Sequence, residues 1–167
     1  MGPPAHPPAL QVADDEFKGY MTTELLKSAA RFAPDRKWHV DTALRVLTTT
    51  GSFLTEDNIT TVVRLFSDSP QLQGYIVKQL YAALKASFVV QPLTQIGVWC
   101  IGEYGDMLLA PDASGSDSPS VGAVLDLMQA ILNSTVTGRN TVRGVCRRAI
   151  HPLCFAAAYT STLPRDR

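Results

Sequence analysis

The residues best suited to chemistry are one histidine and two carboxylates in helical parts of the sequence. His39 follows Trp38 at the predicted start of a helix, where an imidazole could act as a general base. Glu103 and Asp106 stand three residues apart, so both carboxylates could share a metal ion or a proton. However, His39 has no serine or cysteine nucleophile beside it with a group to orient it, and carboxylates at this spacing are common on solvated helix faces. We therefore predict no catalytic, cofactor-binding or metal-binding residue and expect that the protein is not an enzyme.

Glycines and aromatic residues in one apolar segment suggest two other kinds of ligand. Gly97, Gly102 and Gly105 have the composition of a phosphate loop, but they fall within an apolar helix and not between a strand and a helix. We expect them to let neighbouring helices approach closely. Trp99 and Tyr104 could stack on nucleic-acid bases, but we expect both rings to lie in the core.

A small basic group near the C-terminus consists of Arg143, Arg147 and Arg148. It could contact phospholipid headgroups or an acidic partner, although a solvated helix face is the simpler explanation. Over the whole chain, 15 lysines and arginines balance 15 aspartates and glutamates. This balance argues against a dedicated nucleic-acid-binding protein, which usually carries a basic excess.

The cysteines and the hydropathy pattern indicate the compartment. Cys100 lies in an apolar run, whereas Cys146 and Cys154 are near the C-terminus. An odd number of cysteines without metal-ligand spacing suits a reducing compartment such as the cytosol, with Cys100 as a buried thiol. No apolar stretch reaches the roughly 18 residues that a bilayer requires, and the N-terminus lacks the pattern of a signal peptide.

Six segments with helical hydrophobic spacing must position these residues. They run from Phe17 to Pro34, from Asp35 to Gly51, from Thr55 to Phe66, from Ser69 to Phe88, from Pro92 to Leu108 and from Val121 to Leu132. Between the last two, residues 111–120 are polar and predict a loop.

Local signals fix where these helices begin and which face is apolar. Asp35 and Thr55 are predicted N-caps, because their side-chain oxygens can accept a hydrogen bond from the first turn. Ser69-Pro70 and Ser118-Pro119 each give a cap followed by proline in the first turn. The predicted core face of the first helix comprises Phe17, Met21, Leu25, Ala29 and Phe32.

The spacing of the helices predicts a repeat. The first, third and fifth helices begin near residues 16, 55 and 91, a period just under 40 residues that is typical of HEAT or armadillo repeats. One helix pair cannot cover its own apolar face, so neighbouring pairs must stack. We therefore predict an all-α, HEAT/armadillo-like α-solenoid of about three helix pairs. A compact helical bundle is the alternative that the pattern alone leaves open.

Three stretches resemble one family of proteins. They are ARFAPDRKWHVDT with LRVLTTTG (residues 30–42 and 44–51), Tyr75 with KQLYAAL (78–84), and QPL with VWCIGEYGDML (91–93 and 98–108). They resemble gamma-adaptin, a large subunit of the clathrin-associated adaptor protein complex 1 of the trans-Golgi network and endosomes. The resemblance covers roughly residues 16–134. The alpha, delta and epsilon adaptins share the repeat plan but resemble the WCIGE stretch less well.

The resemblance implies a scaffold built into a larger complex. Residues 16–150 would form an adaptin trunk segment with a loop near 111–119, between a disordered proline-rich leader over 1–15 and an irregular tail over 151–167. Its partners would be the second large, medium and small adaptins, with clathrin and Arf-type GTPase contacts outside this part and no nucleic acid. The protein would be cytoplasmic and peripheral on the Golgi, endosomes and clathrin-coated vesicles, acting in vesicle-mediated intracellular protein transport. No binding residue of the family can be assigned to a position of this sequence.

The family pattern also implies chain beyond both ends of the resemblance. Gamma-adaptins have many helical repeats before the position of Phe17, and more trunk, a hinge and an ear domain after about Thr137. We therefore expect a fragment, a truncated isoform or an incorrect gene model. The alternative functions are another large adaptin class or an unrelated HEAT-repeat scaffold, for example in nuclear transport. The repeat period cannot separate these, but the stretch from Trp99 to Asp106 favours adaptin.

Overall fold

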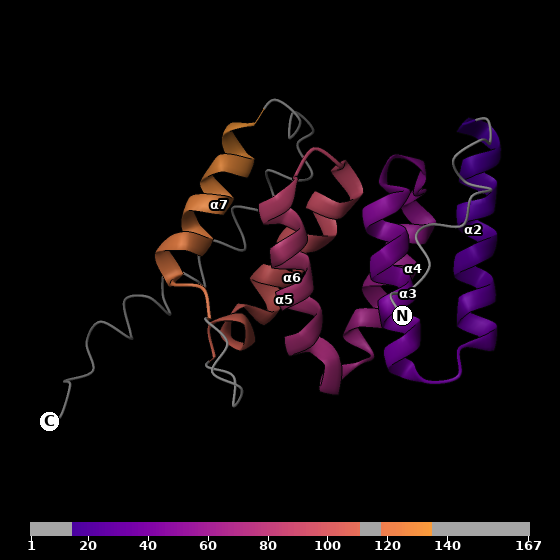
Figure 1. Ribbon diagram of the computed structural model, residues 1–167, viewed down its shortest axis with the longest axis horizontal. Coiled ribbons are helices and arrows are strands. Elements are labelled where there is room, and N and C mark those ends of the chain that lie inside the picture. Colours follow the sequence, from indigo (N-terminus) through magenta and orange to yellow (C-terminus); the bar gives the residue numbers. More distant parts are fainter. Residues whose placement is uncertain (1–14, 111–117, 135–167) are drawn as a thin grey trace, which may run out of the picture.

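The computed structural model describes residues 15–110 and 118–134, and the regular structure in these parts is helical (Figure 1). The α-helices are α2 (Asp15–Phe32), α3 (Arg36–Thr49), α4 (Glu56–Ser67), α5 (Gln73–Ala86), α6 (Gln91–Leu109) and α7 (Val121–Asn133), with short 3-10 turns η1 (Gly51–Phe53) and η2 (Pro70–Leu72). This confirms the all-α prediction and each of the six expected helices. Residues 1–14, 111–117 and 135–167 lie outside the described residues, and with them most of the predicted leader over 1–15, most of the loop, the end of the predicted trunk segment and the tail over 151–167.

Side-chain caps start three of the helices. The Asp35 carboxylate accepts a hydrogen bond from the Trp38 backbone N–H at 2.7 Å, at the start of α3. Thr55 accepts from the Asn58 N–H at 3.4 Å at the start of α4. Both predicted caps are confirmed, and Ser120 plays the same part for α7.

The two predicted serine–proline caps differ in outcome: Ser69 stands at the N-cap position of η2 with Pro70 in the first turn but makes no side-chain cap, and Ser118 does not cap α7. The Ser69 hydroxyl donates to the Leu65 carbonyl at 2.7 Å, at the end of the preceding helix, and α5 begins only after η2. The Ser118 hydroxyl donates to the Ala110 carbonyl at 2.8 Å and so bridges the ends of the loop. In both cases the serine hydroxyl donates to a backbone carbonyl earlier in the chain. It therefore does not accept a hydrogen bond from the first turn of the next helix.

The helices form two layers, with α2, α4 and α6 in one and α3 and α5 in the other, while α7 packs on α6. They follow one another in a row from α2 to α7 (Figure 1). Consecutive helices are antiparallel because their connections are short, and the most extensive contact joins α5 to α6. The predicted stack of helix pairs is therefore confirmed.

The core runs between the two layers. Helix α6 contributes the most to it, with eleven buried residues. Among the apolar residues in the first half of α6, Trp99 is the one that is partly exposed. The largest side chains that are fully buried include Leu47, Phe66, Ile76, Leu80, Leu84, Ile96, Ile101, Leu108, Met128 and Ile131. Because each repeat supplies part of this core, no single pair could bury it alone.

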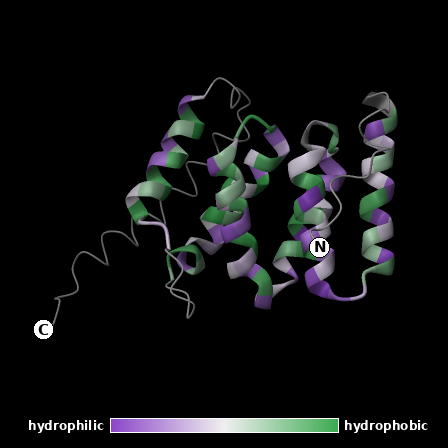
Figure 2. Cartoon of the chain, in the orientation of Figure 1, coloured by the Kyte–Doolittle hydropathy of each residue, from purple (hydrophilic) through white to green (hydrophobic). Residues whose placement is uncertain are grey.

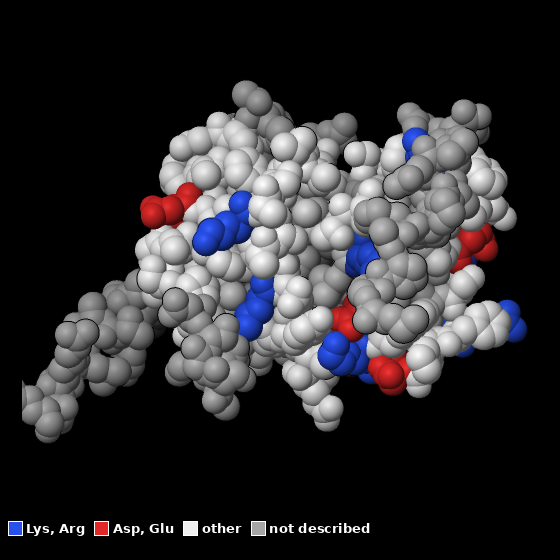
Figure 3. Space-filling model, viewed as in Figure 1, with Lys and Arg blue, Asp and Glu red and all other residues white. Residues whose placement is uncertain are grey.

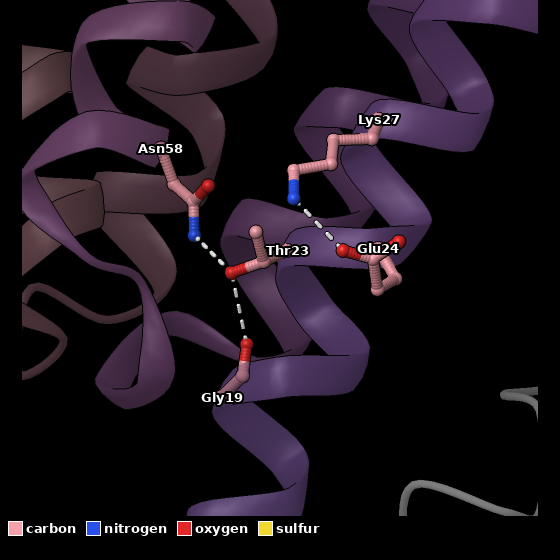
Figure 4. Close-up of polar contacts among 5 residues, drawn as sticks. All are labelled: Gly19, Thr23, Glu24, Lys27 and Asn58. Atoms are coloured by element: carbon pink, nitrogen blue, oxygen red, sulfur yellow. Dashed lines mark hydrogen bonds and ion pairs between the residues drawn. The ribbon is translucent and has the colours of Figure 1, made fainter.

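A buried polar contact joins α2 to α4 (Figure 4). The Asn58 side-chain amide donates to the Thr23 hydroxyl oxygen at 2.9 Å, and that hydroxyl donates to the Gly19 carbonyl at 3.0 Å. Asn58 is buried, whereas the neighbouring Lys27–Glu24 ion pair at 2.8 Å is exposed. The amide contact therefore fixes how α2 sits on α4, while the exposed pair contributes little.

Replacing Asn58 by alanine should lower the free energy of unfolding by about 1–2 kcal/mol, because a buried hydrogen bond between helices is lost. Urea denaturation followed by circular dichroism measures the change. The matched control is Thr61→Ala on the same helix, whose exposed hydroxyl only donates to the Asp57 carbonyl. An equal loss in both variants would show that the contact between α2 and α4 has no stabilising role.

The predicted core face of α2 is mostly wrong. Phe32 is 72% exposed, Phe17 is 52% exposed and Leu25 is also exposed. The residues of α2 that are buried are Thr22, Leu26 and Ala29. Both sides of this helix carry apolar residues at helical spacing, so the hydrophobic period alone does not show which side is buried.

Candidate interaction surfaces

The residues considered for chemistry do not converge into one site. His39 is partly buried near the start of α3, and burial followed by the charge of Arg36 lowers the pKa of its imidazole. Glu103 and Asp106 are exposed on α6. Within residues 15–110 and 118–134, no group of three or more histidines, cysteines and carboxylates is placed to hold a metal ion. The basic group and two of the cysteines, namely Arg143, Arg147, Arg148, Cys146 and Cys154, lie outside the described residues.

The aromatic pair of α6 is only partly in the core. Tyr104 is buried, as predicted, but Trp99 remains partly exposed. The two rings meet edge to face, with centroids 5.9 Å apart and planes at 88°. Helix α6 departs from helical geometry at Tyr104, where φ is −120° and ψ is 24°. The two rings therefore pack on each other, with Tyr104 in the core and Trp99 at its edge.

Cys100 is the buried thiol that the sequence predicts. Its side chain is fully buried in α6. Burial first, and the charge of Glu103 second, raise the pKa of the thiol far above its ordinary value. Since the thiolate is the reactive form, Cys100 should be inert in the folded chain.

We expect Cys100 to resist alkylation by a thiol reagent at pH 8 until the chain unfolds. The variant Cys146→Ser/Cys154→Ser isolates this thiol, and mass spectrometry follows its labelling with and without urea. Because the pKa is raised, labelling of the folded variant should stay slow as the pH rises from 7 to 9. Rapid labelling without urea would contradict the burial of this residue.

The first candidate surface is the outer side of α2, which we call the α2 outer surface. It comprises the exposed residues Phe17, Tyr20, Leu25 and Phe32. Figure 2 shows hydrophobic residues recurring along α2, which stands at one end of the row. Four large apolar side chains exposed on one helix make this surface a candidate contact site for protein. Sequence analysis placed Phe17, Leu25 and Phe32 in the core and did not single out Tyr20, since spacing alone does not distinguish an interior from an interface.

The second candidate surface is a groove between α3 and α5, which we call the α3–α5 groove. It encloses about 510 Å³ and is lined by Asp41, Leu44, Arg45, Thr48, Tyr75, Gln79, Leu80, Ala82 and Ala83. Sequence analysis missed it, because its two walls come from separate helices whose lining residues are at least 27 positions apart (Thr48 to Tyr75). An alignment of the predicted repeats with one another could have indicated that these residues of α3 lie opposite those of α5.

One end of the α3–α5 groove is held by a polar network. The Tyr75 hydroxyl donates to one oxygen of the Asp41 carboxylate at 2.8 Å, and the Lys37 ammonium donates to the other oxygen at 2.8 Å. The ammonium also lies 4.7 Å from the centre of the Tyr75 ring. Burial, and then the hydrogen bond to Asp41, raise the pKa of Tyr75, so the phenol remains a donor. This network fixes α3 against α5.

Comparison with known proteins gives the family. Residues 9–151, which are most of the chain, match the Adaptin N terminal region. The chain belongs to the adaptin family. The AP-1 complex subunit gamma of Dictyostelium discoideum is 38% identical over 139 residues, or 79% of this chain. The human AP-1 complex subunit gamma-like 2 is 37% identical over 75% of the chain. These matches confirm the resemblance to gamma-adaptin.

The adaptin comparisons also show how much of a relative this chain represents. The chain spans 16% of the length of the Dictyostelium and human gamma subunits. The AP-2 complex subunit alpha-2 of Dictyostelium is 27% identical over 59% of the chain. The higher identity to the gamma subunits agrees with the preference for gamma over alpha adaptin that the WCIGE stretch gave.

Proposed function

We propose that this adaptin chain is a structural scaffold segment of a clathrin adaptor complex, acting in vesicle-mediated transport between the trans-Golgi network and endosomes. The observation that carries this proposal is the similarity to AP-1 gamma subunits over three quarters of the chain. The stacked helices support it, since a solenoid offers extended surfaces for other subunits. Residues 16–150 would act as one trunk segment, and no catalytic role is proposed.

The proposed partners are the second large, medium and small adaptins. Through them the chain would lie in the cytoplasm and associate peripherally with Golgi and endosomal membranes. None of the described helices is long and apolar enough to cross a bilayer. The α2 outer surface would pack against a further helix pair in a longer trunk, because stacking is how such repeats cover apolar faces.

A chimaera tests the proposal. The region of the Dictyostelium AP-1 gamma subunit that aligns with this chain is replaced by the chain, and the chimaera is expressed with the other three subunits. We expect all four to co-purify. The variant Phe17→Asp/Phe32→Asp in the chimaera should reduce assembly, because it places charges against the preceding repeat. Lys27→Asp, an exposed change on the same helix, is the matched control.

Two outcomes would overturn the proposal. One is a soluble, folded chimaera that binds none of the other adaptins. The other is assembly that proceeds equally well with both aromatic residues replaced by aspartate. Either result would favour a HEAT-repeat scaffold of another pathway, such as nuclear transport.

A further inference from the structure

The two layers of helices carry opposite charge. Helices α3 and α5 together bear five basic residues and one acidic residue, namely Arg36, Lys37, Arg45, Lys78 and Lys85 against Asp41. Helices α4 and α6 bear four acidic residues and one basic residue, namely Glu56, Asp57, Glu103 and Asp106 against Arg64. Helix α2 adds three acidic and three basic residues, so among these described helices the α3 and α5 layer has a net positive charge and the α2, α4 and α6 layer a net negative charge.

The basic layer is visible on the face that Figure 3 shows, where blue side chains are spread over α3 and α5. A face with an excess of one charge attracts ligands of the opposite charge over about 8–10 Å at physiological ionic strength. The α3–α5 groove lies within this face, so its ligand should be acidic.

Arg45 is the residue that gives the groove its charge. Its side chain is exposed on the α3 wall, and it has no ion pair with any residue in the described parts of the chain. Lys37, by contrast, is already paired with Asp41 at the other end. A guanidinium binds a carboxylate through two parallel hydrogen bonds, which makes Arg45 a good receptor for glutamate or aspartate.

The lining of the groove is about half apolar in character. Leu44 lies at its base, and Ala82 and Ala83 on α5 have short side chains that leave the groove open. Thr48 and Gln79 add neutral hydrogen-bonding groups along the walls. A ligand that fits therefore alternates carboxylates with apolar side chains.

We propose that the α3–α5 groove binds an acidic, partly apolar polypeptide segment of a partner protein, with a carboxylate on Arg45 and an apolar side chain over Leu44 and Ala83. An anionic membrane is the competing ligand for a basic face. A flat bilayer would touch the ridges of α3 and α5 but not the base of a groove between them. The inference rests on charge and shape alone and does not require the adaptor role.

Fluorescence anisotropy with the full chain tests this inference. The probe is a fluorescein-labelled peptide of alternating glutamate and leucine blocks, and a peptide with lysine in place of glutamate is its counterpart. The acidic peptide should bind, and Arg45→Glu should weaken binding by about tenfold, since it turns an attraction at close range into a repulsion. Arg64→Glu, the same change on α4 in the acidic layer, should leave the affinity unchanged. Raising the salt concentration should weaken binding to the wild-type chain.

Two further arms keep the test decisive. Arg45→Ala, which removes the guanidinium without adding an acidic group, should also weaken binding and serves if Arg45→Glu does not fold. Circular dichroism checks the folding of each variant. Sedimentation with phosphatidylcholine vesicles containing phosphatidylserine tests the membrane alternative. The proposal is overturned if the lysine peptide binds as well as the acidic one, if Arg64→Glu weakens binding equally, or if only the vesicles bind. Since no other adaptin is present, failure here leaves the chimaera result unaffected.

Discussion

Leu80→Asp should unfold the chain. Leu80 is completely buried on α5, in the middle of the stack. Removing its side chain alone would cost about 2–5 kcal/mol, and an ionised carboxylate without a partner in the core adds several more. A domain of this size is stable by only about 5–15 kcal/mol, so the sum approaches or exceeds its whole stability.

Circular dichroism and gel filtration at pH 7 measure the effect of this substitution. Helical signal should be lost and the chain should elute as an expanded or aggregated species. Gln79→Asp is the matched control, because it places the same side chain one residue earlier, on the exposed wall of the groove. It should change the free energy of unfolding by less than about 0.5 kcal/mol. A folded Leu80→Asp variant would mean that this side of α5 is not in the core.

The sequence predicts the positions of the helices well, because the hydrophobic period and the residues that begin and end a helix are local features of the chain. Asp35 and Thr55 cap their helices through contacts three residues along the chain, which neighbouring residues decide. The predictions for Ser69 and Ser118 fail because each hydroxyl donates to a backbone carbonyl earlier in the chain and makes no side-chain cap. A prediction from neighbouring residues therefore fails where one hydroxyl can form either of two hydrogen bonds.

The surfaces are harder to predict than the fold, because they depend on which helix lies beside which. Phe32 and Leu26 are both apolar and both fit a helical period, yet one is exposed and the other buried. The α3–α5 groove pairs Asp41 with Tyr75, and only the stacking of one repeat on the next brings them together. The charge separation between layers also becomes visible only once the helices are assigned to layers.

Gly97→Val should be among the most damaging small changes, because the Leu84 side chain of α5 occupies the space beside residue 97 of α6. A Cβ atom at residue 97 would lie 2.7 Å from Cδ1 and 3.1 Å from Cγ of Leu84, closer than real Cβ contacts. Leu84 is completely buried and has little room to move aside. Overpacking of this kind costs about 1–3 kcal/mol or more, while valine regains only a few tenths over glycine in a helix. We expect a net loss of about 2–3 kcal/mol in urea denaturation.

The control for this loss is Gly122→Val on α7, where the nearest atom to a new Cβ is the Ser120 hydroxyl oxygen at 3.8 Å. Both substitutions change the same residue type within a helix, but only the first meets a buried neighbour. Gly122→Val should therefore be neutral or slightly stabilising. An equal loss at both positions would trace the effect to the helix backbone and not to the contact between α5 and α6.

A double variant decides whether Leu84 is the obstacle. Leu84→Ala removes three carbon atoms and alone should cost about 2–5 kcal/mol by leaving a cavity. Gly97→Val adds three carbon atoms next to that cavity, so the pair roughly conserves core volume, the kind of change that cores tolerate best. The double variant should therefore be more stable than the sum of the single losses predicts, by about 1–3 kcal/mol. Additive losses would mean that the two side chains do not compete for one space. In that case the absence of a side chain at residue 97 would not be what allows these helices to pack so closely.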